Sequence, residues 1–247
     1  MMTSAAAPSI LLRGIAELVT NDPDAGPGLL GIVPNAAVVI DDGRIGWVGP
    51  ATAAPAADTA VDVDGRAVLP GWVDAHTQVV FARDRVAEFT ARMSGETPLD
   101  RAPSTVDDTR AATDAELLAV ARWHRAEMLA GGTTCAATAT GYGLTPKDEA
   151  RSATTAQAAG FDEVIYFAAN TVPADYADDP DAYLDLVCGP MLDAVAPVVR
   201  SIGVTCGGGL RYRKVPAGAR RRATHQPDRP GLRHRRRLFA RLHQGRR

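Results

Sequence analysis

The sequence predicts an α/β fold in which a small β-sandwich precedes a parallel sheet flanked by helices. Residues 10–68 contain short strand-like segments separated by turns, whereas strand-like and helix-like segments alternate from residue 69 onward. Such alternation favours parallel βαβ units. The chain has 247 residues, 46% of them hydrophobic, which is enough for one large or two small domains with a buried core.

Short strands are expected in the opening segment. Residues 42–43 are an Asp-Gly pair between two apolar runs, a pattern typical of a β-hairpin turn. Alanine and proline residues at 51–57 indicate a connector. We therefore expect an all-β unit, a small sandwich, whose strands cover residues 10–12, 37–40, 45–48 and 61–63.

Capping residues mark the helices of the second segment. Thr113 and Glu116 have the spacing of a capping box, and Gly131 follows the last apolar positions of that helix. Pro180 stands in the first turn of a later helix. The expected helices cover residues 113–130, 147–159 and 181–187, and the strands between them cover residues 133–138 and 163–167.

The strand around residue 70 changes abruptly from apolar to polar side chains. Apolar residues at 68, 69, 72 and 73 give way to Asp74, His76 and Gln78. Side chains alternate between the two faces of a strand, so His76 and Gln78 point the same way. Two ligand-type residues at this spacing can bind one metal ion, although a neutral amide oxygen is a much weaker ligand for zinc or iron than imidazole.

Three candidate functional residues follow predicted strands directly. They are His76, Tyr142 and Asn170. In a barrel of alternating strands and helices, functional residues lie at the carboxyl ends of the strands. The pattern therefore predicts one site to which all three side chains contribute.

Cysteine content and hydropathy exclude several classes of protein. The three cysteines, Cys135, Cys188 and Cys206, match neither a disulfide framework nor a zinc module, and they fit a reducing cytoplasm. The first fourteen residues lack the basic and apolar regions of a signal peptide. No apolar run approaches the roughly 18 residues of a membrane span. We expect a cytoplasmic protein without a membrane partner.

Charge divides the chain sharply near residue 210. Residues 1–209 contain 13 basic and 28 acidic residues, whereas residues 210–247 contain 14 basic residues and one acid. Arginine, proline, glycine and alanine, which have GC-rich codons, supply 23 of residues 211–247. We interpret the tail as an out-of-frame translation of a GC-rich gene. The alternative is a basic arm that binds nucleic acid through its phosphates, although no specific nucleic acid is expected.

Motifs spread along residues 69–193 identify a family resemblance. Residues 70–76 have the pattern Pro-Gly-hydrophobic-hydrophobic-Asp-x-His, which is typical of amidohydrolases. Arg85-x-x-Glu88-Phe89 and Thr-Gly-Tyr-Gly-Leu at 140–144 are more specific. On these motifs the chain resembles the imidazolonepropionase family of metal-dependent amidohydrolases, over about residues 10–200. The other matching segments are residues 81–89, 104–106, 109–112, 128–134, 172–173 and 189–193.

The resemblance implies an amidohydrolase-type composite of a small N-terminal β-sandwich and a partial (β/α)8 TIM barrel. Residues 1–68 would form part of the sandwich, residues 69–209 the first half of the barrel, and residues 210–247 a basic, disordered tail. A complete barrel typically takes about 250 residues, so the barrel would be incomplete. A homodimer is the expected assembly of an intact protein.

The resemblance also implies a reaction and a set of site residues. Members of the family bind a zinc or iron ion whose activated water opens the ring of 4-imidazolone-5-propanoate to N-formimino-L-glutamate in histidine degradation. His76 and Gln78 occupy the positions of metal ligands. Arg85, Tyr142 and Asn170 occupy substrate-binding positions, Arg85 as a clamp for the propionate group. No separate catalytic residue is assigned.

Three departures from the family set this chain apart. Gln78 replaces a histidine ligand, and Asn170 stands where the family has another histidine. The remaining ligands, a histidine and an aspartate, come from strands beyond residue 209 in the family, where this chain has only the basic tail. The sequence therefore predicts an inactive chain.

Simpler interpretations of the same residues stay open. His76 could be a strand-end histidine bonded to backbone, and Gln78 either a decayed ligand or a retained one. Arg85 could be a solvated arginine, Tyr142 a turn aromatic and Asn170 the cap of a turn. The alternatives for function are a non-catalytic remnant with a basic nucleic-acid-binding tail and an amidohydrolase acting on another cyclic amide.

Overall fold

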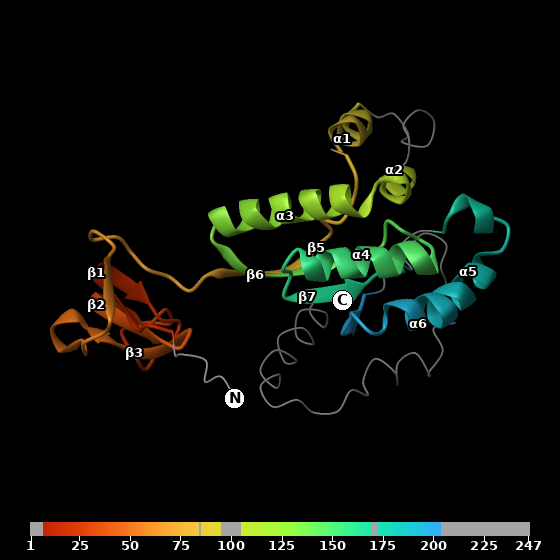
Figure 1. Cartoon of the computed structure of the whole chain (residues 1–247). Coiled ribbons are helices and arrows are strands. Elements are labelled where there is room, and N and C mark those ends of the chain that lie inside the picture. Colours follow the sequence, from red (N-terminus) through yellow and green to blue (C-terminus); the bar gives the residue numbers. More distant parts are fainter. Residues whose placement is uncertain (1–6, 84, 95–104, 169–171, 204–247) are drawn as a thin grey trace. The chain divides into compact units, whose positions relative to one another are not determined.

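The computed structural model describes residues 7–83, 85–94, 105–168 and 172–203. The chain separates into two compact units, Met1–Gly71 and Trp72–Arg247 (Figure 1). Asn170, Cys206 and the whole basic tail lie outside the described residues.

The first unit is a four-stranded sheet in the order β3-β2-β1-β4. Its strands are β1 (Ile10–Val19), β2 (Ile32–Asp41), β3 (Arg44–Pro50) and β4 (Thr59–Asp62), with a short helix η1 (Ala51–Ala53) after β3. The predicted hairpin joins β2 to β3, and Asp42 and Gly43 both have the positive φ angles that such a turn requires. The buried apolar side chains of its core are Ile15, Leu18, Ala36 and Val38.

The described residues of this unit form one sheet, where the sequence analysis expected a small sandwich. β1 is longer than the predicted strand because it continues past an irregularity between Leu12 and Ile15 and pairs with β2 along its whole length. Near the C-terminal end of β1, Leu18 also forms an isolated parallel bridge with Val68. A single long, bent strand thus takes up residues that the sequence analysis left unassigned.

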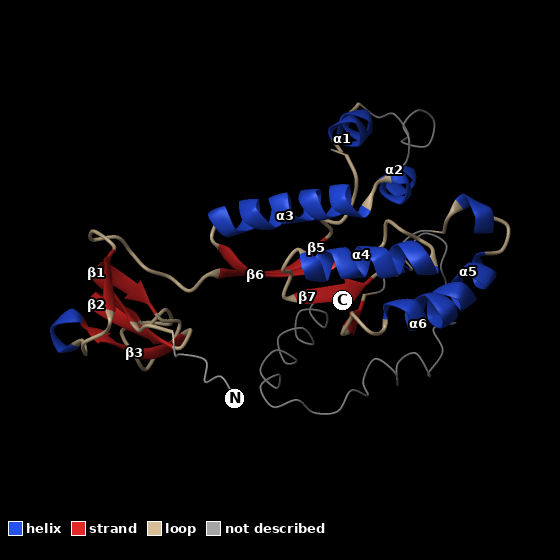
Figure 2. Cartoon of the chain, viewed as in Figure 1, coloured by secondary structure: helices blue, strands red, loops and turns tan. Residues whose placement is uncertain are grey.

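The second unit contains a parallel sheet whose strands follow one another in sequence order (Figure 2). The strands are β5 (Trp72–Thr77), β6 (Thr133–Ala139), β7 (Glu163–Tyr166) and β8 (Ser201–Ile202). The helices are α1 (Val86–Met93), α2 (Thr105–Ala111), α3 (Asp114–Ala130), α4 (Pro146–Ala158), α5 (Pro180–Leu186) and α6 (Leu192–Val195), with short helical turns η4 (Ala174–Tyr176) and η5 (Val187–Met191). Parallel strands that each pair with the next in the chain confirm the predicted α/β class.

The predicted helix starts are confirmed. Thr113 and Glu116 form both hydrogen bonds of the capping box at the start of α3. α4 begins at Pro146 behind a Thr145 cap, and α5 begins at Pro180. Proline is favoured at the first helical position because its missing N–H would have no partner there.

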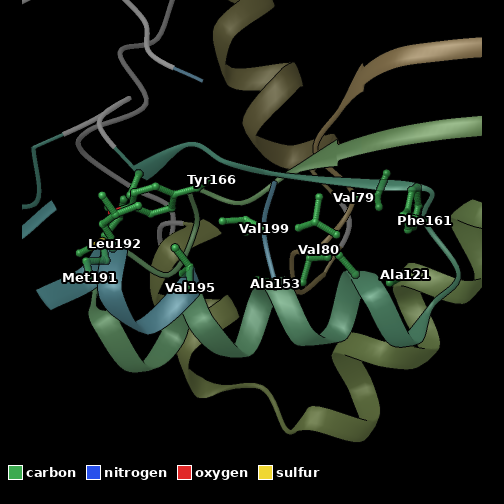
Figure 3. Packing of buried hydrophobic residues seen from close by; sticks show 14 of the residues in the cluster. Val79, Val80, Ala121, Ala153, Phe161, Tyr166, Met191, Leu192, Val195 and Val199 are labelled. Atoms are coloured by element: carbon green, nitrogen blue, oxygen red, sulfur yellow. The ribbon is translucent and has the colours of Figure 1, made fainter. Parts of the chain in front are cut away.

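Alternate residues of the strands serve two different faces of the sheet. Ala136, Val164 and Tyr166 pack into the main core, where Figure 3 shows Tyr166 and Val199 beside the helices that carry Ala153 and Val195. The other face carries a smaller cluster made of Ala137, Ala139, Ile165 and Phe167. The sheet is therefore covered on its helical side by a large apolar core. None of the described helices combines the length and the apolar character that a bilayer crossing requires.

Candidate functional site

The end of β5 is joined to β6 by side-chain hydrogen bonds. The Thr77 hydroxyl donates to the carbonyl oxygen of Ala137 at 2.9 Å. The Asp74 carboxylate accepts the backbone N–H of His76 at 3.1 Å, and the exposed His76 ring meets the edge of Phe167 at 5.8 Å between centroids. Asp74, His76 and Thr77 at the end of β5 thus each make a contact that fixes the strand end, and His76 is accessible from solvent.

Gln78 faces the loop that follows β6. Its amide nitrogen donates to the carbonyl oxygen of Thr140 at 3.0 Å. A carbonyl oxygen can only accept, so the nitrogen and not the oxygen of the amide must point at Thr140. This nitrogen has no lone pair for a metal ion, and only the amide oxygen of Gln78 could coordinate one.

The described residues do not fit a complete metal site. Among them there is no group of three or more histidine, cysteine, aspartate or glutamate side chains that could hold an ion together. A catalytic zinc site needs about three protein ligands and one open position. The pairing of His76 and Gln78 at a metal stays a prediction, and no chemical step is assigned to a metal in this chain.

Arg85 and Tyr142 form a short hydrogen bond at the site. Arg85 Nη1 donates to the Tyr142 hydroxyl at 2.6 Å, and the guanidinium carbon lies 5.4 Å from the centre of the Tyr142 ring. The Phe81 ring contacts Tyr142 edge-on, with 5.9 Å between centroids. Two residues that the sequence analysis assigned to substrate binding, far apart in the chain, are thus in direct contact beside the ends of β5 and β6.

Two glycines allow the loop after β6 to take its shape. Gly141 has a φ angle of 123°, and a Cβ atom there would stand 2.7 Å from the carbonyl oxygen of Phe167. At Gly143 a Cβ atom would lie 2.6 Å from the backbone of Asp148. Both positions therefore require glycine, and Tyr142 lies between them.

A buried carboxyl group lies under this loop. Glu149, on α4, has no solvent exposure, and its Oε1 accepts the backbone N–H groups of Gly143 and Leu144, each at 2.8 Å. Burial raises the pKa of Glu149, and hydrogen bonds from the Thr140 side chain and from the loop backbone offset this only in part. The sequence analysis missed Glu149, because a glutamate in the first turns of a helix is usually a solvated residue.

Replacing Glu149 with glutamine should flatten the pH dependence of stability. The pKa of Glu149 is raised in the folded chain. Its stabilising contribution is therefore present below the unfolded-state pKa and lost as the pH rises through the folded-state pKa. Glutamine keeps the acceptor oxygen and does not ionise, so the thermal midpoint of the variant relative to the parent should increase from pH about 4 to neutral. Circular dichroism melts across this range test it, and a difference that does not vary with pH would contradict it.

Comparison with known proteins identifies relatives of this chain. No family model matches it. Imidazolonepropionase of Saccharopolyspora erythraea is 55% identical over 200 residues, which are 80% of this chain and 49% of that protein. The imidazolonepropionases of Salinispora tropica and Mycolicibacterium smegmatis are 52% and 50% identical, each over 80% of this chain and 50% of their own length. The chain therefore spans about half the length of the curated relatives that it matches.

Two solved structures are also similar in part. One is a mutant N-acetyl-D-glucosamine-6-phosphate deacetylase from Mycobacterium smegmatis, with 18% identity, a TM-score of 0.42, and coverage of 81% of this chain and 44% of that one. The other is atrazine chlorohydrolase from Arthrobacter aurescens complexed with zinc, with 20% identity, a TM-score of 0.46, and coverage of 81% and 47%.

The described fold agrees with the class that the sequence predicts. A β unit precedes parallel strands in sequence order, with polar residues at their carboxyl ends, as in the amidohydrolase-type composite that the sequence predicts. Within that class, the resemblance to imidazolonepropionase is confirmed, and the chain is a partial-length relative of these enzymes.

Proposed function

We propose that this chain carries the substrate-binding residues of an imidazolonepropionase-type hydrolase, which opens the ring of 4-imidazolone-5-propanoate to N-formimino-L-glutamate in histidine degradation. The contact between Arg85 and Tyr142 is the observation that supports the proposal most directly. Similarity to imidazolonepropionases over 80% of the chain supports the choice of substrate. A cytoplasmic location and a homodimeric assembly remain part of the proposal.

Arg85 and Tyr142 suit the propionate group of this substrate. A guanidinium group has five N–H donors in a planar fork that matches a carboxylate. The Tyr142 hydroxyl accepts from Arg85 Nη1 and can donate its own proton to a carboxylate oxygen. Asn170, which lies outside the described residues, is proposed as a further substrate contact.

The metal in this proposal is zinc or iron, as the family resemblance implies. His76 and Gln78 are the described residues proposed as its ligands. Since they do not make a complete site, the role assigned to this chain is to bind and orient the substrate. Any residues that complete the metal site would lie outside the described residues.

Replacing Arg85 with alanine should weaken the binding of a ring-bearing propionate. The probe is imidazole-4-propionate, titrated calorimetrically into the purified full chain. Loss of a hydrogen-bonded charge should reduce affinity by about 10- to 100-fold, and Arg85→Lys should lose much of it because lysine cannot form the planar fork. Arg66→Ala, at an exposed ion pair of the first unit, is the matched control.

The probe also separates this proposal from its alternatives. 4-Methylimidazole, which lacks the carboxylate, should bind weakly to the parent chain and equally weakly to Arg85→Ala. Equal affinity of the parent and Arg85→Ala for imidazole-4-propionate would remove the proposed role of Arg85. Preference for a different cyclic amide would favour an amidohydrolase of other specificity.

A further inference from the structure

The loop of residues 140–144 is held by four different elements. At its start, Thr140 donates its N–H to the carbonyl of Ile165 on β7 at 2.9 Å, and its carbonyl accepts from Gln78 after β5 at 3.0 Å. At its end, Arg110 on α2 donates through Nε to the Gly143 carbonyl at 2.7 Å, while Glu149 on α4 accepts from the Gly143 N–H. The two ends are thus fixed on both sides of Tyr142.

The loop sequence cannot supply this order by itself. Tyr142 is flanked by Gly141 and Gly143, and glycine has more accessible backbone conformations than any other residue. Small changes of backbone angle at either glycine would redirect the Tyr142 side chain. The position of the Tyr142 hydroxyl therefore depends on contacts that other elements make with the loop, in addition to the side-chain contacts of Tyr142 with Arg85 and Phe81.

Glu149 is the residue best suited to provide such a contact. One oxygen atom binds two successive N–H groups of the loop, those of Gly143 and Leu144, at the same distance of 2.8 Å. The carboxyl is fully buried, so water does not compete for these donors. Arg110 binds the carbonyl of the same Gly143, so side chains from two helices bind the peptide groups on either side of its Cα.

We propose that Glu149 is a positioning residue that, together with Arg110, sets the orientation of Tyr142 and thereby its contact with Arg85. The importance of this orientation for substrate rests on the proposed function, whereas the structural effect does not. Glu149 lies beneath the loop and acts through the backbone of Gly143 and Leu144. Its carboxyl supplies an acceptor, a role that a glutamine side chain can also fill.

The test compares three variants of the full chain: Glu149→Ala, Glu149→Gln and Met191→Ala. Met191 is fully buried in the main apolar core of the second unit, and its replacement serves as a control for general destabilisation. The five tyrosines are replaced biosynthetically by 3-fluorotyrosine, and the fluorine resonance of Tyr142 is identified by its absence in Tyr142→Phe. Affinity for imidazole-4-propionate is measured on the same samples.

We expect the Tyr142 resonance to shift or broaden in Glu149→Ala and to stay in place in Glu149→Gln and Met191→Ala. Affinity for imidazole-4-propionate should fall about tenfold in Glu149→Ala, since unpaired buried N–H groups disfavour the ordered loop, and recover in Glu149→Gln. If Glu149→Ala does not fold, Arg110→Leu, which removes the donor to Gly143, should show the same changes in smaller degree.

The Tyr142 resonance tests the positioning role, and the affinity for imidazole-4-propionate tests the proposed substrate, so each claim can be refuted without the other. An unchanged Tyr142 resonance in Glu149→Ala, or equal changes in Glu149→Ala and Met191→Ala, would overturn the positioning role. A displaced Tyr142 resonance in Glu149→Ala, with no binding of imidazole-4-propionate even by the parent chain, would uphold the positioning role and refute the proposed substrate.

Discussion

Replacing Gln78 with histidine should raise the affinity of the full chain for Zn²⁺ or Co²⁺ by at least about tenfold, because imidazole is a far better ligand for these ions than a neutral amide. Loss of a residue that only hydrogen-bonds to a ligand typically lowers metal affinity by about 10- to 100-fold. Gain or loss of a ligand itself should change metal affinity by at least as much. The new imidazole would have two ring nitrogens. One N–H can replace the Gln78 donor to the Thr140 carbonyl, which would orient the other nitrogen as a ligand.

Equilibrium dialysis or the visible spectrum of bound Co²⁺ measures this effect. His76→Ala in the Gln78→His background should abolish the gain, since a single imidazole remains. Gln78→Leu, which removes the amide without supplying a ligand, is the control for changes in folding. Identical metal affinity of the parent and Gln78→His would show that Gln78 does not occupy a former ligand position.

Replacing Tyr183 with alanine should cost about 3–5 kcal/mol of unfolding free energy in the second unit, the range for removal of a large core aromatic. Tyr183 is fully buried in the main core, its ring lies 5.3 Å from that of Tyr176, and its hydroxyl donates to the carbonyl of Ala168 at 3.0 Å. Tyr183→Phe should cost only about 1–2 kcal/mol, since it leaves one carbonyl without its donor.

Guanidinium unfolding followed by fluorescence measures these costs. Trp72 and Trp123 report on the second unit and Trp47 on the first, so Trp47→Phe isolates the signal of interest. Two units can unfold in separate transitions, and the comparison applies to the transition seen in that background. Tyr176→Ala, at a half-buried position, should cost less than Tyr183→Ala. Equal losses for the Phe and Ala variants would place the energy in the hydroxyl group and contradict the packing argument.

Local signals allowed much of the secondary structure to be predicted. The capping pair Thr113 and Glu116, the proline at the start of α5 and the Asp42-Gly43 turn each fix the backbone through neighbours a few residues away. All the residues that produce such a signal lie within a few positions of one another in the sequence. The parallel arrangement of the strands followed from their alternation with helices.

Features that depend on tertiary contacts could not be predicted from the sequence. Gln78 was interpreted from its position on a strand, and nothing in the sequence indicated that its amide would point at Thr140. Glu149 is on the buried side of α4 only because the loop backbone turns two N–H groups toward it. The contact between Arg85 and Tyr142 was approached through family resemblance, since their separation in sequence carries no local signal.

The sharing of Thr140 between two neighbouring strands has a consequence for anyone who designs variants of this protein. Its carbonyl serves Gln78 and its hydroxyl oxygen accepts the N–H of Phe167 at 3.2 Å. Residues with a common partner have effects that do not add. Substitution of Thr140 removes the hydroxyl that accepts the N–H of Phe167 but keeps the carbonyl that Gln78 binds, so positions 78 and 140 are coupled through the backbone of residue 140. Compatible solutions are to be sought among paired substitutions, with the three strand ends treated as a single unit of design.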